Sequence, residues 1–221
     1  MAVNWKKAEE YVKAGKGRIE KVRYAHNVYD EKTHNATSTI ENEVIVLDPA
    51  GLEGIVYFIP CPKSPHGCDV DPTGEYIVGS GKLAAVIPVF SFTKMLEAIT
   101  KKDFIGNYDS IPVLKYESVL YGEVKKPGLG PLHTEFDGKG NAYTSFFVSS
   151  EIVKWNIKDL TVLDRAPTYY SIGHLCIPGG DSRKPNAKYV IAYNKITKDR
   201  YLPTGPELAQ SAQLYLSLIH I

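Results

Sequence analysis

The sequence has 221 residues, of which 43% are hydrophobic and 23% are charged, so its composition is that of a globular rather than a disordered chain. Its 26 basic and 25 acidic residues give a formal net charge of +1, which argues against a protein that binds nucleic-acid phosphates. No apolar stretch approaches the ~18–20 residues of a membrane-spanning helix, and no apolar run follows Lys6 and Lys7 as in an export signal. Three cysteines (Cys61, Cys68 and Cys176) are too few for a disulfide scaffold.

Two short helices are predicted. The first spans residues 4–14, where Trp5, Ala8 and Val12 form one stripe and Asn4 can cap the start. The second spans residues 93–102 and begins near Ser91 or Thr93. Its apolar positions are Met95, Leu96 and Ile99, and two lysines occupy its last turn.

Most of the remaining chain is typical of short β-strands separated by turns. The expected strands are Val44–Leu47, Ile55–Ile59, Tyr76–Gly79, Ala84–Phe90, Ser118–Tyr121, Ala142–Val148, Ile152–Asn156 and Tyr189–Tyr193. This pattern, together with 15 tyrosines, 18 glycines and 14 prolines, predicts an all-β sandwich, barrel or propeller with short helical insertions. No linker divides the chain, so we expect one domain or a piece of one.

A local pattern recurs three times: a histidine, a turn, and then a strand that contains tyrosine. It begins at His66, His133 and His174, which are 67 and then 41 residues apart. Spacings near 40–50 residues fit one propeller blade each, if the longer interval contains the helix near residue 95.

These three histidines are candidate metal ligands. A propeller places the same position of each blade at one radius, so equivalent histidines converge on the central channel. Imidazole suits copper, zinc, iron and nickel, and histidines without convergent carboxylates favour copper or zinc. The companions two residues further on are Cys68, Glu135 and Cys176, which share the histidine's face of a regular strand.

The residues alone leave simpler interpretations open. The histidines can pack or donate hydrogen bonds without binding metal, as in a non-catalytic propeller scaffold or binding domain. Cys68 and Cys176 fit buried small hydrophobes better than ligands. Cys61 and Cys68 could form a disulfide in an oxidising compartment. His26 and His34 lie in a polar stretch that is typical of solvated surface.

The motifs around the histidines are specific enough to suggest a family. The longest runs from Gly128 to Tyr143 and contains His133; the others are Ser64–Gly67, Val153–Asn156, Ile172–Leu175 and Lys198–Pro206. In this order, over about residues 5–215, they resemble the nitrous oxide reductases. The group exported through the general secretory route is the more similar one, because Cys176 stands where the other group typically has histidine.

The resemblance implies a copper-dependent oxidoreductase of denitrification that reduces N2O to N2 and water. Enzymes of this family are periplasmic homodimers that accept electrons from a donor such as a c-type cytochrome or cupredoxin. A seven-bladed propeller holds CuZ, a sulfide-bridged four-copper centre with seven histidine ligands, and a C-terminal cupredoxin domain holds CuA. His66, His133 and His174 match three CuZ ligands. Residues 1–215 are therefore expected to be part of the propeller, inactive without the missing ligands and the CuA domain.

The resemblance also implies calcium near CuZ, with Tyr29 and Glu31 as ligands. Ser64 stands where the family has a calcium-binding asparagine, and Gln210 replaces a later acidic ligand. Both losses weaken the expectation, because calcium prefers carboxylate and carbonyl oxygens. Lys195 matches a family lysine near CuZ, where it would assist catalysis without binding copper.

The last six residues, 216–221, depart from the family. They resemble a translated sequencing-library adapter, so we expect a non-native tail and exclude His220 from the ligands.

Overall fold

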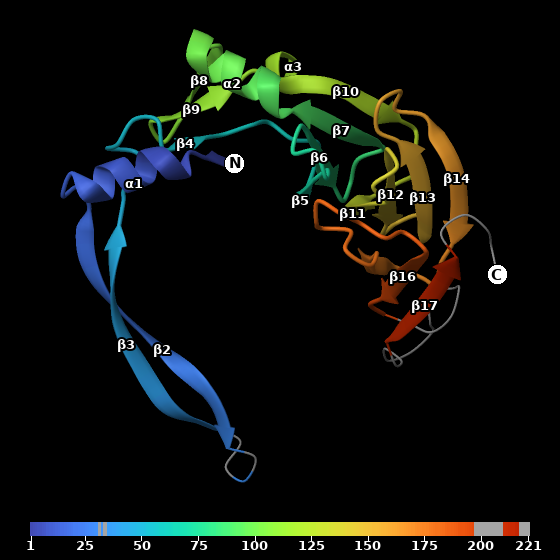
Figure 1. Cartoon of the computed structure of the whole chain (residues 1–221), viewed down its shortest axis with the longest axis horizontal. Helices are drawn as coiled ribbons and strands as arrows, with labels where there is room; N and C mark the ends of the chain where they lie inside the picture. The colour runs from blue at the N-terminus through green and yellow to red at the C-terminus, as the bar shows by residue number, and fades with distance from the viewer. Residues whose placement is uncertain (31, 33–34, 197–209, 217–221) are drawn as a thin grey trace. The chain divides into compact units, whose positions relative to one another are not determined.

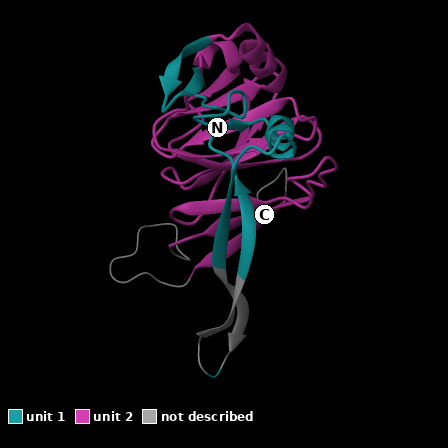
Figure 2. Cartoon of the chain, turned by 90° about the vertical axis from the view of Figure 1, so that its left-hand side faces the viewer, with its two compact units in different colours: residues 1–59, 104–113 teal, residues 60–103, 114–221 magenta. Residues whose placement is uncertain are grey.

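The structure is a computed structural model that describes residues 1–30, 32, 35–196 and 210–216, without the side chains of residues 24–30 and 35–40 (Figure 1). The chain divides into two compact units (Figure 2). The first comprises residues 1–59 and 104–113, and the second comprises residues 60–103 and 114–221. Strands dominate and helices are short, which confirms the all-β prediction. No helix within the described ranges is long and apolar enough to cross a membrane.

The described part of the first unit contains one helix and three strand pairs. Helix α1 (Trp5–Lys13) begins as predicted, because the Asn4 side chain accepts a hydrogen bond from the Lys7 amide at 3.1 Å. Its predicted apolar stripe is not buried, and the Trp5 side chain is 70% exposed. The strand pairs are β1 (Ala2–Val3) with β4 (Val56–Tyr57), β2 (Arg18–Asp30) with β3 (Asn35–Val46), and β8 (Phe104–Tyr108) with β9 (Ile111–Leu114).

The second unit contains three antiparallel sheets, each with its strands in simple up-and-down order from the first strand outward. The first sheet comprises β5 (Pro65–Val70), β6 (Tyr76–Gly81), β7 (Val86–Ser91) and β10 (Leu120–Lys125). The second sheet comprises β11 (Pro131–Phe136), β12 (Asn141–Phe146), β13 (Glu151–Asn156) and β14 (Val162–Pro167). The third sheet comprises β15 (Ile172–Cys176), β16 (Tyr189–Asn194) and β17 (Ser211–Leu216).

An insertion separates the third and fourth strands of the first sheet, which explains the longer histidine spacing. It begins with the predicted second helix, α2 (Phe92–Lys101), whose cap is Ser91. Met95 and Ala98 are buried, whereas Leu96 is 49% exposed. The expected strand Ser118–Tyr121 is wrong in its first half, because helix α3 (Tyr116–Val119) ends where β10 begins.

Neighbouring sheets pack face to face through two hydrophobic clusters. Successive residues of a strand point to opposite faces, so Ala142 joins the cluster facing the first sheet and Tyr143 joins the cluster facing the third. The largest fully buried side chain, Trp155, lies in the first cluster and donates a 2.9 Å hydrogen bond from Nε1 to Thr144 Oγ1. These clusters hold the three sheets against one another.

Two buried aspartates close the turns that follow the first strands. The Asp71 carboxylate accepts hydrogen bonds from the amides of Thr73 and Tyr76, and Asp137 accepts them from the amides of Lys139 and Asn141. Asparagine and aspartate favour such turns because their side chains bond to the local backbone. The recurrent turn of the sequence is therefore the tip of the β5–β6 and β11–β12 hairpins.

The chain end is only partly described. Leu216, the first residue of the expected non-native tail, belongs to β17 and pairs with Tyr189. Residues 217–221, with His220, lie outside the described residues.

Candidate metal centre

The three candidate histidines lie on the first strands of the three sheets. Strand β11 contacts both β5 and β15, which brings His133 between the neighbouring strands that contain His66 and His174. The ring centroids of His66 and His174 are 5.9 Å apart, and those of His133 and His174 are 4.8 Å apart. Side chains distant in sequence therefore form one histidine cluster, and their role as copper ligands stays a prediction.

Each histidine lies in a one-residue β-bulge. Register shifts occur between Pro65 and Cys68, between Pro131 and Thr134, and between Ile172 and Leu175. In every case, two residues of the first strand oppose one residue of the second strand. A bulge bends the strand and redirects side chains, and such bulges are common beside functional sites.

The bulges correct the expectation that the three histidines occupy equivalent positions. His133 and His174 immediately precede the residue at which regular pairing resumes, whereas His66 lies one position earlier. Gly67 therefore occupies the place of the other two histidines. Since the bulge contains both positions, a histidine at either one still reaches the shared cluster.

His133 is the most enclosed ring of the cluster, with a side chain that is 18% exposed. Its Nδ1 atom accepts a 3.0 Å hydrogen bond from the Leu175 amide, and its Nε2 atom lies 3.9 Å from Asp69 Oδ1. Burial lowers the pKa of His133, and the neighbouring rings of His174 and His66 lower it further, although Asp181 opposes them. A neutral ring is the form that binds metals.

The other two histidines are exposed. Partial burial lowers the pKa of His66, as do the positive charges of Lys82 and Lys195 and the ring of His174. The backbone carbonyl of Leu132 acts in the opposite direction. Two of the three imidazoles are thus biased towards the neutral form.

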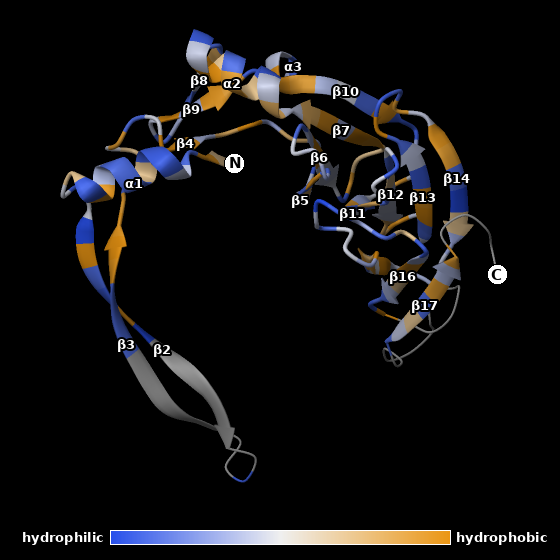
Figure 3. Cartoon of the chain, in the orientation of Figure 1, coloured by the Kyte–Doolittle hydropathy of each residue, from blue (hydrophilic) through white to orange (hydrophobic). Residues whose placement is uncertain are grey.

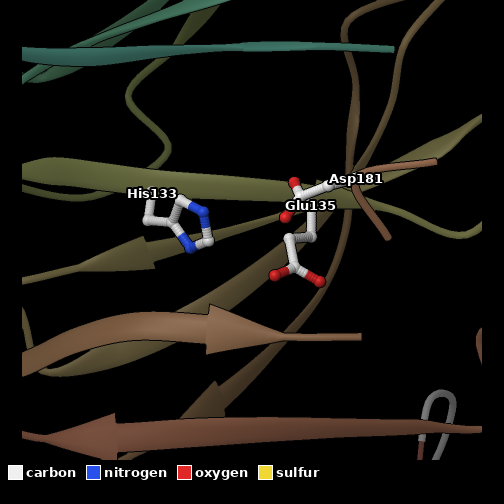
Figure 4. Close-up of side chains that lie close together, drawn as sticks. All are labelled: His133, Glu135 and Asp181. Atoms are coloured by element: carbon white, nitrogen blue, oxygen red, sulfur yellow. The ribbon is translucent and has the colours of Figure 1, made fainter. Parts of the chain in front are cut away.

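Carboxylates lie beside the histidine cluster. Ligand atoms of His133, Glu135 and Asp181 lie within 4.8 Å of one another, and Figure 4 shows the two carboxylates on one side of the ring. Burial raises the pKa of Glu135 to about 7, opposed by the Ile177 amide, and Asp181 and Asp69 raise it further. Burial likewise raises the pKa of Asp69 to about 7.

The sequence pattern identified Glu135 as a companion of His133 but missed Asp69 and Asp181. Asp69 comes three residues after His66, where a regular strand would turn it to the other face, and Asp181 lies in the turn after β15. The proposed companion Cys68 is exposed rather than buried, and Cys176 is partly buried. All three cysteines are free thiols, with no disulfide between Cys61 and Cys68.

The Lys195 side chain packs against Gly173, which lies in the bulge that contains His174. A Cβ atom on Gly173 would stand 2.3 Å from Lys195 Cε, so only glycine leaves room for this lysine stem. Its charge is one of the causes that lower the pKa of His66. The structure therefore brings Lys195 beside the histidine cluster, and its catalytic role there stays a prediction.

The calcium residues are less well supported. Glu31 lies outside the described residues, and so does the side chain of Tyr29. Gln210 and Asn194 line a hollow of about 300 Å³, and Asn194 Oδ1 is buried without a hydrogen-bond partner in the described part of the chain. The residues that line this hollow include no carboxylate, and neither Tyr29 nor Glu31 is among them, so the hollow lends no support to these predicted calcium ligands. Calcium at Tyr29 and Glu31 stays a prediction.

The histidine cluster does fit copper. Three imidazoles converge from separate strands, and imidazole suits copper as well as zinc, iron and nickel. The carboxylates beside His133 correct the expectation of a site without convergent carboxylates, so the donor set does not single out copper. Because the Leu175 amide occupies Nδ1 of His133, a metal at that ring would have to compete with this contact or bind at Nε2. The other two rings are exposed, so a metal can reach them.

Comparisons with known proteins identify the relatives of this chain. A family model described as a nitrous oxide reductase propeller repeat matches residues 165–216. The chain is 32% identical over 188 residues to a nitrous-oxide reductase of Stutzerimonas stutzeri, covering 79% of this chain and 28% of that protein. It is 34% identical over 160 residues to that of Ralstonia nicotianae, covering 67% and 23%. The chain thus spans about a quarter of the length of these curated relatives.

Among solved structures, hydrazine synthase of Kuenenia stuttgartiensis matches with a TM-score of 0.46 and 11% identity, covering 85% of this chain and 38% of that one. This likeness is too weak to assign a fold. The up-and-down sheets and the matched repeat instead define a β-propeller protein, here with a histidine cluster on its first strands. The chain belongs to the nitrous oxide reductase family, of which it represents part of the propeller domain.

Proposed function

We propose that His66, His133 and His174 supply three ligands of the CuZ centre in a complete enzyme that reduces N2O to N2 and water. The observation that supports this proposal is the convergence of the three rings, with centroid distances of 5.9 and 4.8 Å, from strands distant in sequence. The names of the curated relatives support the substrate and the reaction.

The copper centre would supply the electrons and the binding site for N2O, which amino-acid side chains cannot provide. The chain's own contribution is geometric and electrostatic. The three sheets hold the imidazoles on rigid strands, and the depressed pKa values of His66 and His133 favour neutral rings. The bulges direct both possible histidine positions to the same cluster.

The first prediction concerns the metal content of the complete protein that contains this chain. We expect copper in excess of a two-copper electron-entry site, because the histidine cluster adds a second site. Elemental analysis of the purified protein measures this quantity. A copper content no higher than that of the electron-entry site alone would instead favour the non-catalytic scaffold, in which the histidines only pack.

A second prediction concerns Lys195. We propose that its ammonium group donates a hydrogen bond or a proton to the oxygen that leaves N2O, since it lies beside the cluster and general acids contribute strongly to such steps. The substitution Lys195→Ala in the complete enzyme should reduce turnover by about 100-fold and change its pH profile, because general acid catalysis contributes about 10²–10⁴.

Copper content is the control for this variant, since Lys195 is not proposed as a ligand. Steady-state assays of N2O consumption between acidic and alkaline pH measure the effect. An unchanged rate and an unchanged profile would contradict the proposed role.

We also propose the cellular setting of the family for this protein: a periplasmic homodimer in denitrification, reduced by a c-type cytochrome or a cupredoxin. The support is the family membership alone.

A further inference from the structure

Two carboxylates connect the three strands that contain the histidines. Asp69 of β5 accepts a 2.8 Å hydrogen bond at Oδ2 from the Thr134 amide of β11. Glu135 of β11 accepts a short hydrogen bond at Oε2 from the Ile177 amide, which directly follows β15. Each carboxylate thus joins its own sheet to the next one along the chain.

The two carboxylates occupy equivalent positions in their sheets. Asp69 pairs with Val78 and Glu135 pairs with Tyr143, and each pair is the second after the bulge. In both sheets, the bulge that redirects the histidine is therefore followed by a carboxylate at the same distance, counted in strand pairs. This equivalence is hidden in the sequence, where the acidic residue comes three residues after His66 but two after His133.

The amides that these carboxylates bind need an acceptor. β11 and β15 are the edge strands of their sheets, so one side of each lacks a neighbour within the sheet. A buried backbone amide without a partner destabilises the folded state. Room has been left for one of these acceptors, because a Cβ atom on Gly180 would stand 2.2 Å from Glu135 Oε2.

Both carboxylates also lie against the histidine cluster. Asp69 Oδ1 is 3.9 Å from His133 Nε2, and Glu135 has a ligand atom within 4.8 Å of one on His133. Displacement of either side chain would change the strand spacing and leave His133 less constrained. The remaining direct polar contact of that ring, with the Leu175 amide, depends on the same spacing between β11 and β15.

We propose that Asp69 and Glu135 are positioning residues that set the spacing of the three histidine-bearing strands, and thereby hold the rings together in the histidine cluster. This inference rests on the proposed copper-binding function. The carboxylates act as acceptors for backbone amides and not as copper ligands.

The chain offers a matched control for each residue. Asp71 and Asp137 lie two residues further along the chain, directly after the same strands, and their carboxylates bond within their own hairpin turns. Alanine at these positions therefore removes a buried carboxylate next to the same strand without removing the hydrogen bonds that Asp69 and Glu135 make between sheets.

The experiment uses the complete copper-loaded protein with Asp69→Ala, Glu135→Ala, Asp69→Asn or Glu135→Gln, and the controls Asp71→Ala and Asp137→Ala. The alanine variants at Asp69 and Glu135 should lower copper affinity of the cluster by about 10–100-fold, as loss of supporting contacts does at other metal sites. Their copper absorption spectrum should change, and the amides of Thr134 and Ile177 should exchange hydrogen faster. The asparagine and glutamine variants should keep the copper affinity, the copper absorption spectrum and the amide exchange rates of the wild type, because an amide oxygen also accepts the hydrogen bond.

The controls should keep the copper spectrum of the wild type even where they unfold more readily. If the controls changed the copper spectrum as much as the alanine variants at Asp69 and Glu135, these two residues would contribute only general stability. That result would overturn the inference. Unchanged spectra or unchanged amide exchange in the alanine variants would overturn it as well, and so would failure of Asn and Gln to restore them. A wild-type protein without copper at the cluster would instead refute the proposed function, and this inference with it.

Discussion

Replacement of His174 by alanine should abolish the proposed copper centre. Its ring is the one that contacts both others, at centroid distances of 5.9 Å from His66 and 4.8 Å from His133, so its removal separates the remaining two. Loss of contacts that merely support a metal ligand costs about 10–100-fold in affinity. Loss of the ligand itself should reduce cluster copper and N2O reduction by more than about 100-fold, measured by elemental analysis and by activity in the complete protein.

The surface substitution Lys125→Ala is the control for this variant, because Lys125 is exposed on β10, in the first sheet, away from the first strands. It should leave copper content and activity unchanged. A folded His174→Ala protein with full copper content and activity would show that the histidine cluster has no part in metal binding.

Replacement of Trp155 by alanine should produce the largest loss of stability. This side chain is fully buried between the first and second sheets, and truncation of buried tryptophan costs about 3–5 kcal/mol. The change also leaves Thr144 Oγ1 without its indole donor. Urea denaturation monitored by circular dichroism measures the free energy of unfolding. The variant should unfold at a lower urea concentration than the wild type, by the amount that corresponds to this loss of free energy.

Phenylalanine at the same position separates packing from hydrogen bonding. Trp155→Phe keeps an aromatic ring between the sheets but loses the donor to Thr144, so its free energy of unfolding should lie between those of the wild type and the alanine variant. An alanine variant as stable as the wild type would contradict the packing of the two sheets through this residue.

Short apolar strands bounded by turns could be predicted from the sequence, and those that depend on pairing could not. Tyr76–Gly79 and Ile152–Asn156 were predicted from such apolar runs, and the structure confirms them within β6 and β13. Most of the hairpin of β2 and β3 was missed, because exposed residues such as Arg23 and Glu41 give it no apolar pattern. Tertiary pairing, not local preference, stabilises such segments.

The histidine cluster could be predicted because its residues recur in one local pattern. Repeated units of a propeller place their corresponding residues near one axis, so the repeat in the sequence predicts that the histidines lie close together. The carboxylate surroundings of the cluster could not be predicted in full. The bulge shifts Asp69 relative to Glu135 by one residue in sequence, and Asp181 comes from a turn that no periodic pattern describes. Cys68 and Cys176 are likewise not equivalent. Regular pairing after the bulge resumes at Cys68 itself, but one residue before Cys176 in the third sheet.

The insertion between β7 and β10 has a kinetic consequence. The second sheet closes through short local turns, whereas β7 must wait for β10 until residues 92–119 have been synthesised. Chain closure over such a distance costs entropy that grows only slowly with length, but it delays the pairing. Until then β7 presents an open edge to other nascent chains, so the insertion prolongs the time in which the first sheet can pair wrongly.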